Sequence, residues 1–126
     1  MLHQLMYIKQ RREKGLRNDL ARVLRLRKQV EQEISRLQQQ QRDVLKAWRL
    51  ACVQFTGKVD RQGLISWQEN MRSYQLQYEN VGLQLTKQQL QHASLIDDES
   101  HLQAQLRLVM VAQEKINYMI SVDVEK

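Results

Sequence analysis

The sequence contains no proline, four glycines and a single cysteine among its 126 residues. Because proline and glycine punctuate chains into short elements, their scarcity predicts few turns and long uninterrupted segments. The lone Cys52 excludes an intramolecular disulfide and fits a reducing compartment. No apolar run approaches the roughly 20 residues that a membrane-spanning helix needs, and the first residues lack the apolar stretch of a secretory signal peptide. We therefore expect a cytoplasmic protein that does not insert into the membrane directly.

Patterns that carry chemistry are also scarce. There is no glycine-rich phosphate-binding loop, so no nucleotide is expected to bind by that route. His3, His92 and His101 are scattered along the chain and lack the spacing of a metal site. The acidic run 97–99 has no alternation of the kind that a calcium loop requires. These absences predict a protein that is not an enzyme and that has no cofactor and no metal.

The residues that dominate the sequence are leucine, glutamine, arginine, lysine, glutamate and alanine. All six favour helices, because their side chains lose little freedom there. Aromatic residues make up 6% of the chain, and runs of β-branched residues are missing. This composition predicts an all-α fold built from long helices or a coiled coil.

Apolar residues recur at alternating steps of three and four through two long segments, with twelve apolar positions among sixteen and then thirteen among seventeen. So long a seven-residue repeat is typical of a left-handed coiled-coil seam. We predict one hairpin domain over 1–126, with helices over about 2–56 and 61–122 and a loop over about 57–60. The first series is Leu2, Met6, Lys9, Glu13, Leu16, Leu20, Val23, Arg27, Val30, Ile34, Leu37, Gln41, Val44, Trp48, Ala51 and Phe55. The second series is Leu64, Trp67, Met71, Tyr74, Tyr78, Val81, Leu85, Gln88, His92, Leu95, Glu99, Leu102, Leu106, Val109, Gln113, Ile116 and Ile120.

The turn between the two series has three separate signals. Gly57 suits the left-handed conformation that ends a helix, and Asp60 suits the N-cap of the next one. Val59 and Leu64 have the spacing of a hydrophobic staple. A kink in one continuous helix is the alternative. A short loop makes the helices antiparallel neighbours, which predicts an antiparallel coiled-coil hairpin.

Folding the chain about this loop sets an expected register. Pairing Phe55 with Leu64 brings Arg27 near His92, with Glu99 about one heptad away. A buried polar layer of this kind costs stability but can fix the register of a coiled coil. A ligand site at His92 is the alternative interpretation.

Charge is distributed unevenly. Residues 1–28 hold nine lysines and arginines against two acidic residues, whereas residues 96–126 hold three against six. A basic segment suggests a nucleic acid, an anionic membrane or an acidic protein surface as partner. A helical hairpin offers no element that reads a nucleic-acid groove. Two interpretations stay open: the basic side chains are solvated and partly paired with the acidic C-terminal arm, or they enter an acidic protein ring or groove, where charge steers association.

Aromatic residues gather near the predicted loop, at Trp48, Phe55, Trp67, Tyr74 and Tyr78. Tryptophan is too bulky to be covered fully in a two-helix seam, so part of each ring should stay exposed. Core packing explains these residues, and so does an interaction hot spot at the tip of the hairpin. The sequence leaves both interpretations open.

Several short motifs resemble one family. They are Leu5-x-x-Ile8-Lys9-x-x-Arg12, Trp48-Arg49-Leu50, the loop 57–63 and Leu64-Ile65-Ser66-Trp67-Gln68. Together with the chain length, they are similar to the central-stalk proteins of type III secretion, the YscO-like proteins of injectisomes and the FliJ-like proteins of flagella. The sequence style is most similar to the stalks of attaching-and-effacing injectisomes.

The resemblance implies a central stalk at the cytoplasmic face of the bacterial inner membrane, with a hairpin similar to the coiled coil of the rotary ATPase gamma subunit. Its expected partners are the hexameric secretion ATPase, whose pore receives the paired termini, the cytoplasmic domain of the export gate, and secretion chaperones. The implied ATPase-facing residues are Lys9, Arg11, Arg12, Lys14, Arg17, Arg22 and Arg25. The implied gate-facing tip comprises Val44, Trp48, Phe55, Trp67, Met71 and Tyr74.

At Val44 the sequence departs from the tyrosine of the family, which weakens that gate contact. Two other functions stay open. One is a coiled-coil scaffold or chaperone-like adaptor without a motor partner. The other is nucleic-acid binding, which a mobility shift would detect.

Overall fold

The computed structural model describes residues 1–54 and 60–125, apart from the side chain of Glu125. It contains two helices, α1 over Leu2–Gln54 and α2 over Arg61–Glu125, and no strand occurs in these ranges. The predicted all-α fold of two long helices is confirmed. α1 reaches Gln54, the last residue described before the gap, and α2 continues to Glu125, three residues beyond the expected end. The predicted roles of Phe55, Gly57 and Val59 concern residues outside the described ranges.

The start of α2 follows the predicted capping chemistry. The backbone N–H of Gly63 donates a 2.7 Å hydrogen bond to Asp60 Oδ1. The N–H of Leu64 donates to the carbonyl of Asp60 at 3.0 Å. Because the first amides of a helix have no partner within the helix, the carboxylate satisfies a donor that would otherwise face water. Asp60 is the N-cap of α2.

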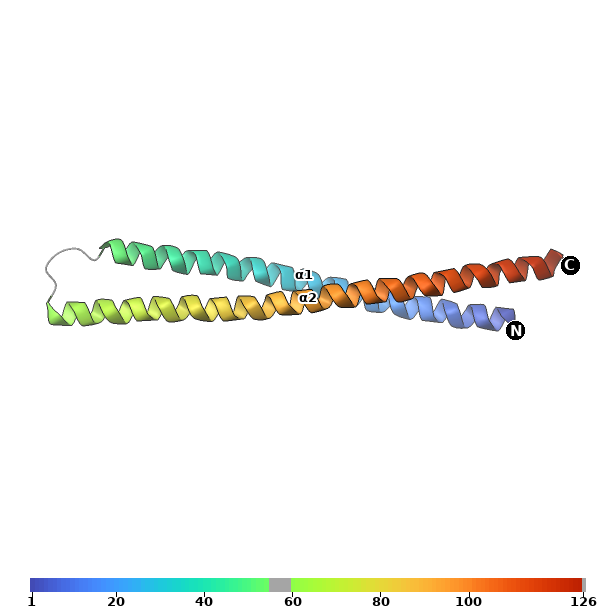
Figure 1. Ribbon diagram of the computed structural model, residues 1–126, viewed down its shortest axis with the longest axis horizontal. Coiled ribbons are helices and arrows are strands. Elements are labelled where there is room, and N and C mark those ends of the chain that lie inside the picture. The colour runs from blue at the N-terminus through green and yellow to red at the C-terminus, as the bar shows by residue number, and fades with distance from the viewer. Residues whose placement is uncertain (55–59, 126) are drawn as a thin grey trace. The chain divides into compact units, whose positions relative to one another are not determined.

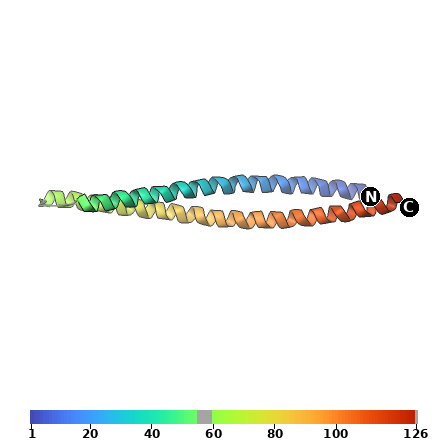
Figure 2. The same ribbon diagram turned by 90° about the horizontal axis from the view of Figure 1, so that it is seen from above.

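The chain divides into two compact units. Unit 1 comprises Met1–Gln29 and Ala93–Lys126, and unit 2 comprises Val30–His92. Within each unit, a stretch of α1 and a stretch of α2 lie side by side and run in opposite directions (Figures 1 and 2). The predicted antiparallel pairing of the helices is therefore confirmed within each unit.

Unit 1 is held together by aliphatic residues at the predicted seam positions. Leu16 of α1 packs with Leu106 and Val109 of α2, and Leu20 and Leu102 lie against this cluster. All five belong to the two series that the seven-residue repeat selects. The alternating three-and-four spacing keeps them on one face of each helix, so they meet when the helices pair.

Unit 2 has fewer buried apolar residues in its described part than unit 1, and its core becomes aromatic toward the end of α1. Val30, Leu37 and Val81 are buried, and Leu37 is only 1% exposed. The rings of Trp48 and Tyr78 pack at a centroid distance of 6.3 Å and an angle of 59°, within the range that aromatic pairs favour. Across both units, each described seam position except Leu64 is buried or half-buried.

The register differs from the expected one. In unit 2 Trp48 packs on Tyr78 rather than level with Met71, and in unit 1 Arg27 pairs with Glu99 rather than with His92. These two contacts lie one heptad along α2 from the expected partners, whereas Cys52 contacts Met71 and Glu31 contacts His92 four residues beyond the expected partners. The helices are therefore displaced by about four to seven residues from the expected register. Because seam positions recur every three or four residues, such a slip buries the same seam, and the apolar pattern alone does not select the register. The first turns of α2 extend past the end of α1 (Figure 1), which leaves Leu64 42% exposed.

Candidate partner-binding surfaces

The predicted basic surface lies on α1 in unit 1. Six of its seven members are exposed, whereas Lys9 occupies a seam position and is half-buried. The exposed members are Arg11, Arg12, Lys14, Arg17, Arg22 and Arg25. The structure thus places most of the predicted basic residues in positions accessible to a partner.

Internal carboxylates neutralise little of this charge. Arg17 lies 3.5 Å from Glu13, and Arg22 lies 3.6 Å from Asp19, each within α1. Exposed pairs of this kind contribute only about 0–1 kcal/mol. The other five basic residues make no ion pair with any described residue; they are Lys9, Arg11, Arg12, Lys14 and Arg25. Their positive charge is available to an external anionic group.

Tyr7 adds an apolar element to the basic surface. The guanidinium carbon of Arg11 lies 5.8 Å from the centroid of the Tyr7 ring, a cation–π geometry. Tyr7 is 59% exposed and the neighbouring Ile8 is 58% exposed. A partner surface that meets this part of α1 therefore encounters both charge and apolar area.

Among the described residues, an ion pair in unit 1 and a histidine–carboxylate contact in unit 2 join α1 to α2. Arg27 pairs with Glu99 in unit 1, and the Glu99 side chain is 16% exposed. In unit 2, His92 Nε2 lies 3.0 Å from Glu31 Oε1. The expected polar interruption of the seam is present, although with different partners. Both contacts join oppositely charged or hydrogen-bonding groups across the helices, which fits a role in register.

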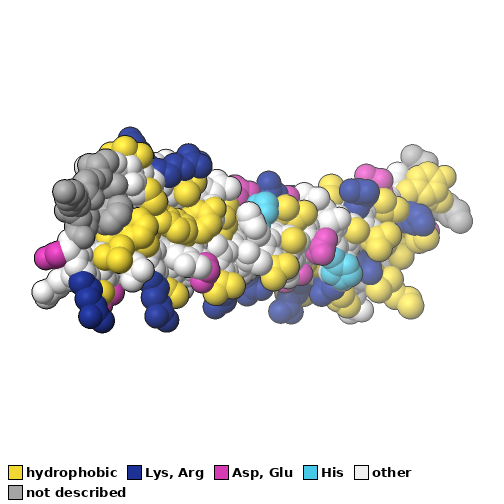
Figure 3. Space-filling view, turned by 60° about the vertical axis from the view of Figure 1, so that its left-hand side comes forward, with side chains coloured by type: hydrophobic (Ala, Val, Ile, Leu, Met, Phe, Trp, Pro, Cys, Tyr) yellow, Lys and Arg dark blue, Asp and Glu magenta, His cyan; other side chains and the backbone are white. Residues whose placement is uncertain are grey.

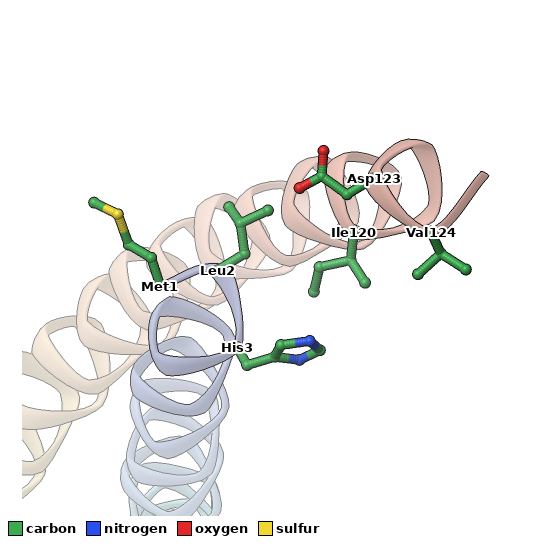
Figure 4. Close-up of a pocket in the computed structure, with 6 residues that line it drawn as sticks. All are labelled: Met1, Leu2, His3, Ile120, Asp123 and Val124. Atoms are coloured by element: carbon green, nitrogen blue, oxygen red, sulfur yellow. The ribbon is translucent and has the colours of Figure 1, made fainter. Parts of the chain in front are cut away.

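The termini of unit 1 border a hollow of about 340 Å³. In Figure 4, Ile120 and Val124 of α2 point to the side on which the His3 ring lies, whereas the Asp123 carboxylate points to the opposite side. The histidine and the carboxylate therefore do not form an acid–base pair. The hollow is a mainly aliphatic surface that the sequence reasoning did not single out.

The predicted tip lies in unit 2, where α1 ends and α2 begins. On the face drawn in Figure 3, hydrophobic side chains gather over this region. A hollow of about 530 Å³ is lined by Leu45, Trp48, Arg49, Cys52 and Val53. Val53 is 72% exposed, so the hollow opens directly to solvent. An apolar partner side chain is the chemistry that this surface accepts.

The five described tip residues are all half-buried, so they contribute to packing between the helices while part of each surface stays accessible; they are Val44, Trp48, Trp67, Met71 and Tyr74. Phe55 lies outside the described residues. Cys52 is exposed, and its Sγ lies 3.5 Å from Met71 Sδ across the two helices. The tip residues therefore pack between the two helices and also form part of the exposed surface.

Titratable chemistry in the described part of the chain is limited. Arg36 donates two hydrogen bonds to Glu33, at 2.6 and 3.0 Å, and these lower the pKa of that carboxyl. The same contacts raise the pKa of the Arg36 guanidinium. Residues 1–54 and 60–125 contain no group of three or more His, Cys, Asp or Glu side chains placed to hold a metal ion.

Neither described helix contains a stretch that is long and apolar enough to cross a membrane.

One apolar surface was missed by the sequence reasoning. Leu76, Leu83 and Leu90 lie on α2 outside the seam, and each is more than half exposed. Their spacing of seven residues is visible in the sequence. The two predicted series do not include these leucines, because one apolar residue per heptad is a weaker pattern than the two apolar positions per heptad of a seam.

Comparisons with protein-family models, with curated proteins and with solved structures find no match for this chain.

Proposed function

We propose that this chain is the central stalk of a type III secretion system, acting between a hexameric secretion ATPase and the export gate at the cytoplasmic face of the bacterial inner membrane. The observation that carries the proposal is the basic surface of α1 in unit 1. Five of its seven cationic side chains have no ion pair with any described residue. The sequence motifs that resemble the YscO-like and FliJ-like stalks supply the partner class.

Unit 1 enters the ATPase ring in this proposal. A single stalk inside a six-fold ring makes unequal contacts with the six subunits. It therefore favours different nucleotide states in different subunits, since a ligand shifts an equilibrium by its differential affinity for the two states. Positive charge on α1 steers the paired termini toward an acidic pore and speeds association. The stalk itself turns over no substrate.

Unit 2 faces the export gate in this proposal. Its tip combines the apolar hollow at Trp48 with half-buried Met71 and Tyr74. Aromatic residues that are partly exposed and partly anchored in a packed seam are typical of interaction hot spots. Val44 supplies a weaker gate contact than the tyrosine of the family, so Trp48 carries most of the apolar contact.

ATP hydrolysis by a purified secretion ATPase tests the proposal. Wild-type chain is expected to stimulate hydrolysis or hexamer assembly. Reversing three charges in Arg11→Glu, Arg12→Glu and Lys14→Glu is expected to weaken binding at low salt by roughly three- to 150-fold, because each exposed charge contributes about 0.2–1 kcal/mol. The weakened binding should also depend less on salt.

The matched control reverses three exposed charges in unit 2, with Arg42→Glu, Lys46→Glu and Arg72→Glu. Both triple variants change the net charge equally, so a general charge effect weakens binding in both. The assignment of unit 1 requires that the control keeps its affinity. Unchanged hydrolysis and unchanged hexamer assembly with the wild-type chain would contradict the stalk function.

The apolar hollow on α1 favours a second candidate, a coiled-coil scaffold or adaptor without a motor partner. Such a protein needs the tip in unit 2 but not the basic surface in unit 1. Affinity capture with the purified chain separates the two functions. Recovery of secretion chaperones without the ATPase, unaffected by the three charge reversals in unit 1, favours the adaptor.

A further inference from the structure

A polar layer interrupts the seam of unit 1 between the Leu16 cluster and the chain ends. The layer consists of Lys9, Glu13 and Gln113, and all three residues are half-buried. Leu16 packs with Leu106, so the repeat places Lys9 level with Gln113 one heptad closer to the chain ends. Glu13 occupies the seam position of α1 between Lys9 and Leu16. The apolar seam is therefore broken at one level by three polar side chains.

The polar layer leaves groups without partners. Gln113 Nε2 is buried and has no hydrogen-bond partner in the described part of the chain. Within the same residues, Lys9 makes no ion pair, and Glu13 makes its ion pair inside α1 rather than across the seam. A buried donor without an acceptor has lost its hydrogen bonds to water without replacing them, so it destabilises the paired helices. The seam pair of Arg27 with Glu99, in contrast, is satisfied across the two helices.

Beyond the polar layer lie two terminal arms, which we define as residues 1–8 and residues 114–124. Among their described side chains Ile116 alone is buried, whereas the Leu16 cluster contains three buried side chains. No hydrogen bond or ion pair joins the described residues of one arm to those of the other. Both arms border the hollow of about 340 Å³, so their ends are not closely packed. The contact between the arms is therefore weaker than the contact within the cluster.

We propose that the terminal arms separate from each other as one cooperative unit while the Leu16 cluster stays paired, and that the polar layer sets the boundary of this opening. A separated arm also loses its helix, because isolated helices shorter than about 12–15 residues are marginal in water. Local opening of this kind costs less free energy than global unfolding. The inference does not depend on whether the chain is a secretion stalk.

Ordinary fraying of the helix ends is the alternative, and it gives a different pattern of amide protection. Fraying loosens each helix independently and residue by residue, so protection against hydrogen exchange rises gradually from each end. Cooperative opening gives the two arms a shared protection and produces a step at the polar layer. The two processes are therefore distinguishable residue by residue.

Amide hydrogen exchange of the full chain, followed by NMR, measures this step. Residues 5–8 and 114–124 are expected to have similar protection factors. These factors are expected to be at least about tenfold lower than those of residues 16–23 and 102–109, which lie on the other side of the polar layer.

Gln113→Leu removes the unpaired amide and extends the apolar seam. It is expected to slow exchange at least about tenfold in both arms, because loss of a buried unsatisfied donor favours the paired helices. The response of residues 5–8, which belong to the other helix, separates paired opening from a local effect on α2. The matched control is Gln4→Leu, at an exposed position outside the seam. Because glutamine and leucine have similar helix propensities, the control is expected to leave exchange of residues 114–124 unchanged.

Thiol labelling gives a second measurement, with Cys52→Ser as the background. Ile116→Cys places a thiol at a buried position of the arm, and Leu106→Cys places one in the Leu16 cluster; the native side chains are 8% and 9% exposed. A maleimide is expected to label position 116 at least about tenfold faster than position 106, since only the arm opens locally. Adding Gln113→Leu is expected to slow labelling at position 116 and to leave position 106 unchanged.

Three results would overturn the proposal. The first is protection that rises gradually from each chain end without a step at the polar layer. The second is slower exchange after Gln113→Leu that is confined to residues 114–124, which would show that the arms open independently. The third is equal labelling rates at positions 106 and 116, which would show that the arms and the cluster open together.

Discussion

Leu37→Ala is expected to destabilise the chain far more than Leu90→Ala does. Leu37 is 1% exposed, so nearly all of its side chain leaves water on folding. Burial of a leucine contributes about 1.5–3 kcal/mol, and leucine-to-alanine changes in cores cost about 2–5 kcal/mol in total. Because a two-helix seam can close partly over a missing side chain, the expected loss is about 2–3 kcal/mol.

Leu90 provides the comparison within the same unit. It is 68% exposed, so less than a third of its surface is buried, and its truncation is expected to cost under about 1 kcal/mol. The assay is urea unfolding followed by far-ultraviolet circular dichroism, with the free energy extrapolated to water. Thermal unfolding should agree, with the midpoint of Leu37→Ala lowered by roughly 4 °C per kcal/mol. Equal losses for the two variants would refute the assignment of the seam.

Three further predictions concern local structure. Gly15→Ala is expected to raise the free energy of unfolding by about 0.5–1 kcal/mol in urea titration, since nothing lies within 4 Å of the added methyl group. Asp60→Ala is expected to cost about 1 kcal/mol and to reduce amide-exchange protection at the start of α2, because the Gly63 amide loses its acceptor. Carboxyl NMR is expected to show a lowered pKa for Glu33, held down by the hydrogen bonds from Arg36. This pair therefore stabilises α1 above the ordinary carboxyl pKa, and the stabilisation is lost as pH falls through the lowered value; Glu33→Gln should abolish that pH dependence.

Each of these predictions has a contradicting outcome. A lower free energy of unfolding for Gly15→Ala would mean that Gly15 adopts a backbone conformation, or makes a contact, that differs from its place in helix α1. Unchanged exchange protection after Asp60→Ala would show that the carboxylate is not the cap in solution. An Arg36→Gln variant that leaves the pKa of Glu33 unchanged would contradict the stated cause.

The fold was predictable because its information is local and repeated. Each heptad of the seam repeats the same apolar spacing, so the polar residues at seam positions Lys9, Glu13 and Gln41 do not obscure the pattern. The cap at Asp60 was also predictable, since capping depends on a residue and the next turn of helix. The register was not predictable, because seam positions recur every three or four residues and a slip along the seam keeps apolar residues together. Arg27 and Glu99 meet only in the observed register.

The candidate surfaces were predictable to a different degree. The exposure of Arg11 and Arg12 follows from their places outside the seam, and the structure agrees. Lys9 occupies a seam position of the repeat and is half-buried, and its assignment to the ATPase-facing group stays a prediction. The hollow that includes Cys52 and Val53 depends on how side chains pack along one face of α1, which sequence spacing does not specify.

Site-specific photo-crosslinking tests the central claim most directly. A benzophenone amino acid replaces Arg12 in unit 1 in one variant and Val53 in unit 2 in another; both positions are exposed. Each variant is irradiated with the secretion ATPase and the cytoplasmic domain of the export gate. The stalk function predicts that position 12 crosslinks to the ATPase and position 53 to the gate domain. Crosslinking of both positions to the same partner, or of neither to either partner, would contradict it.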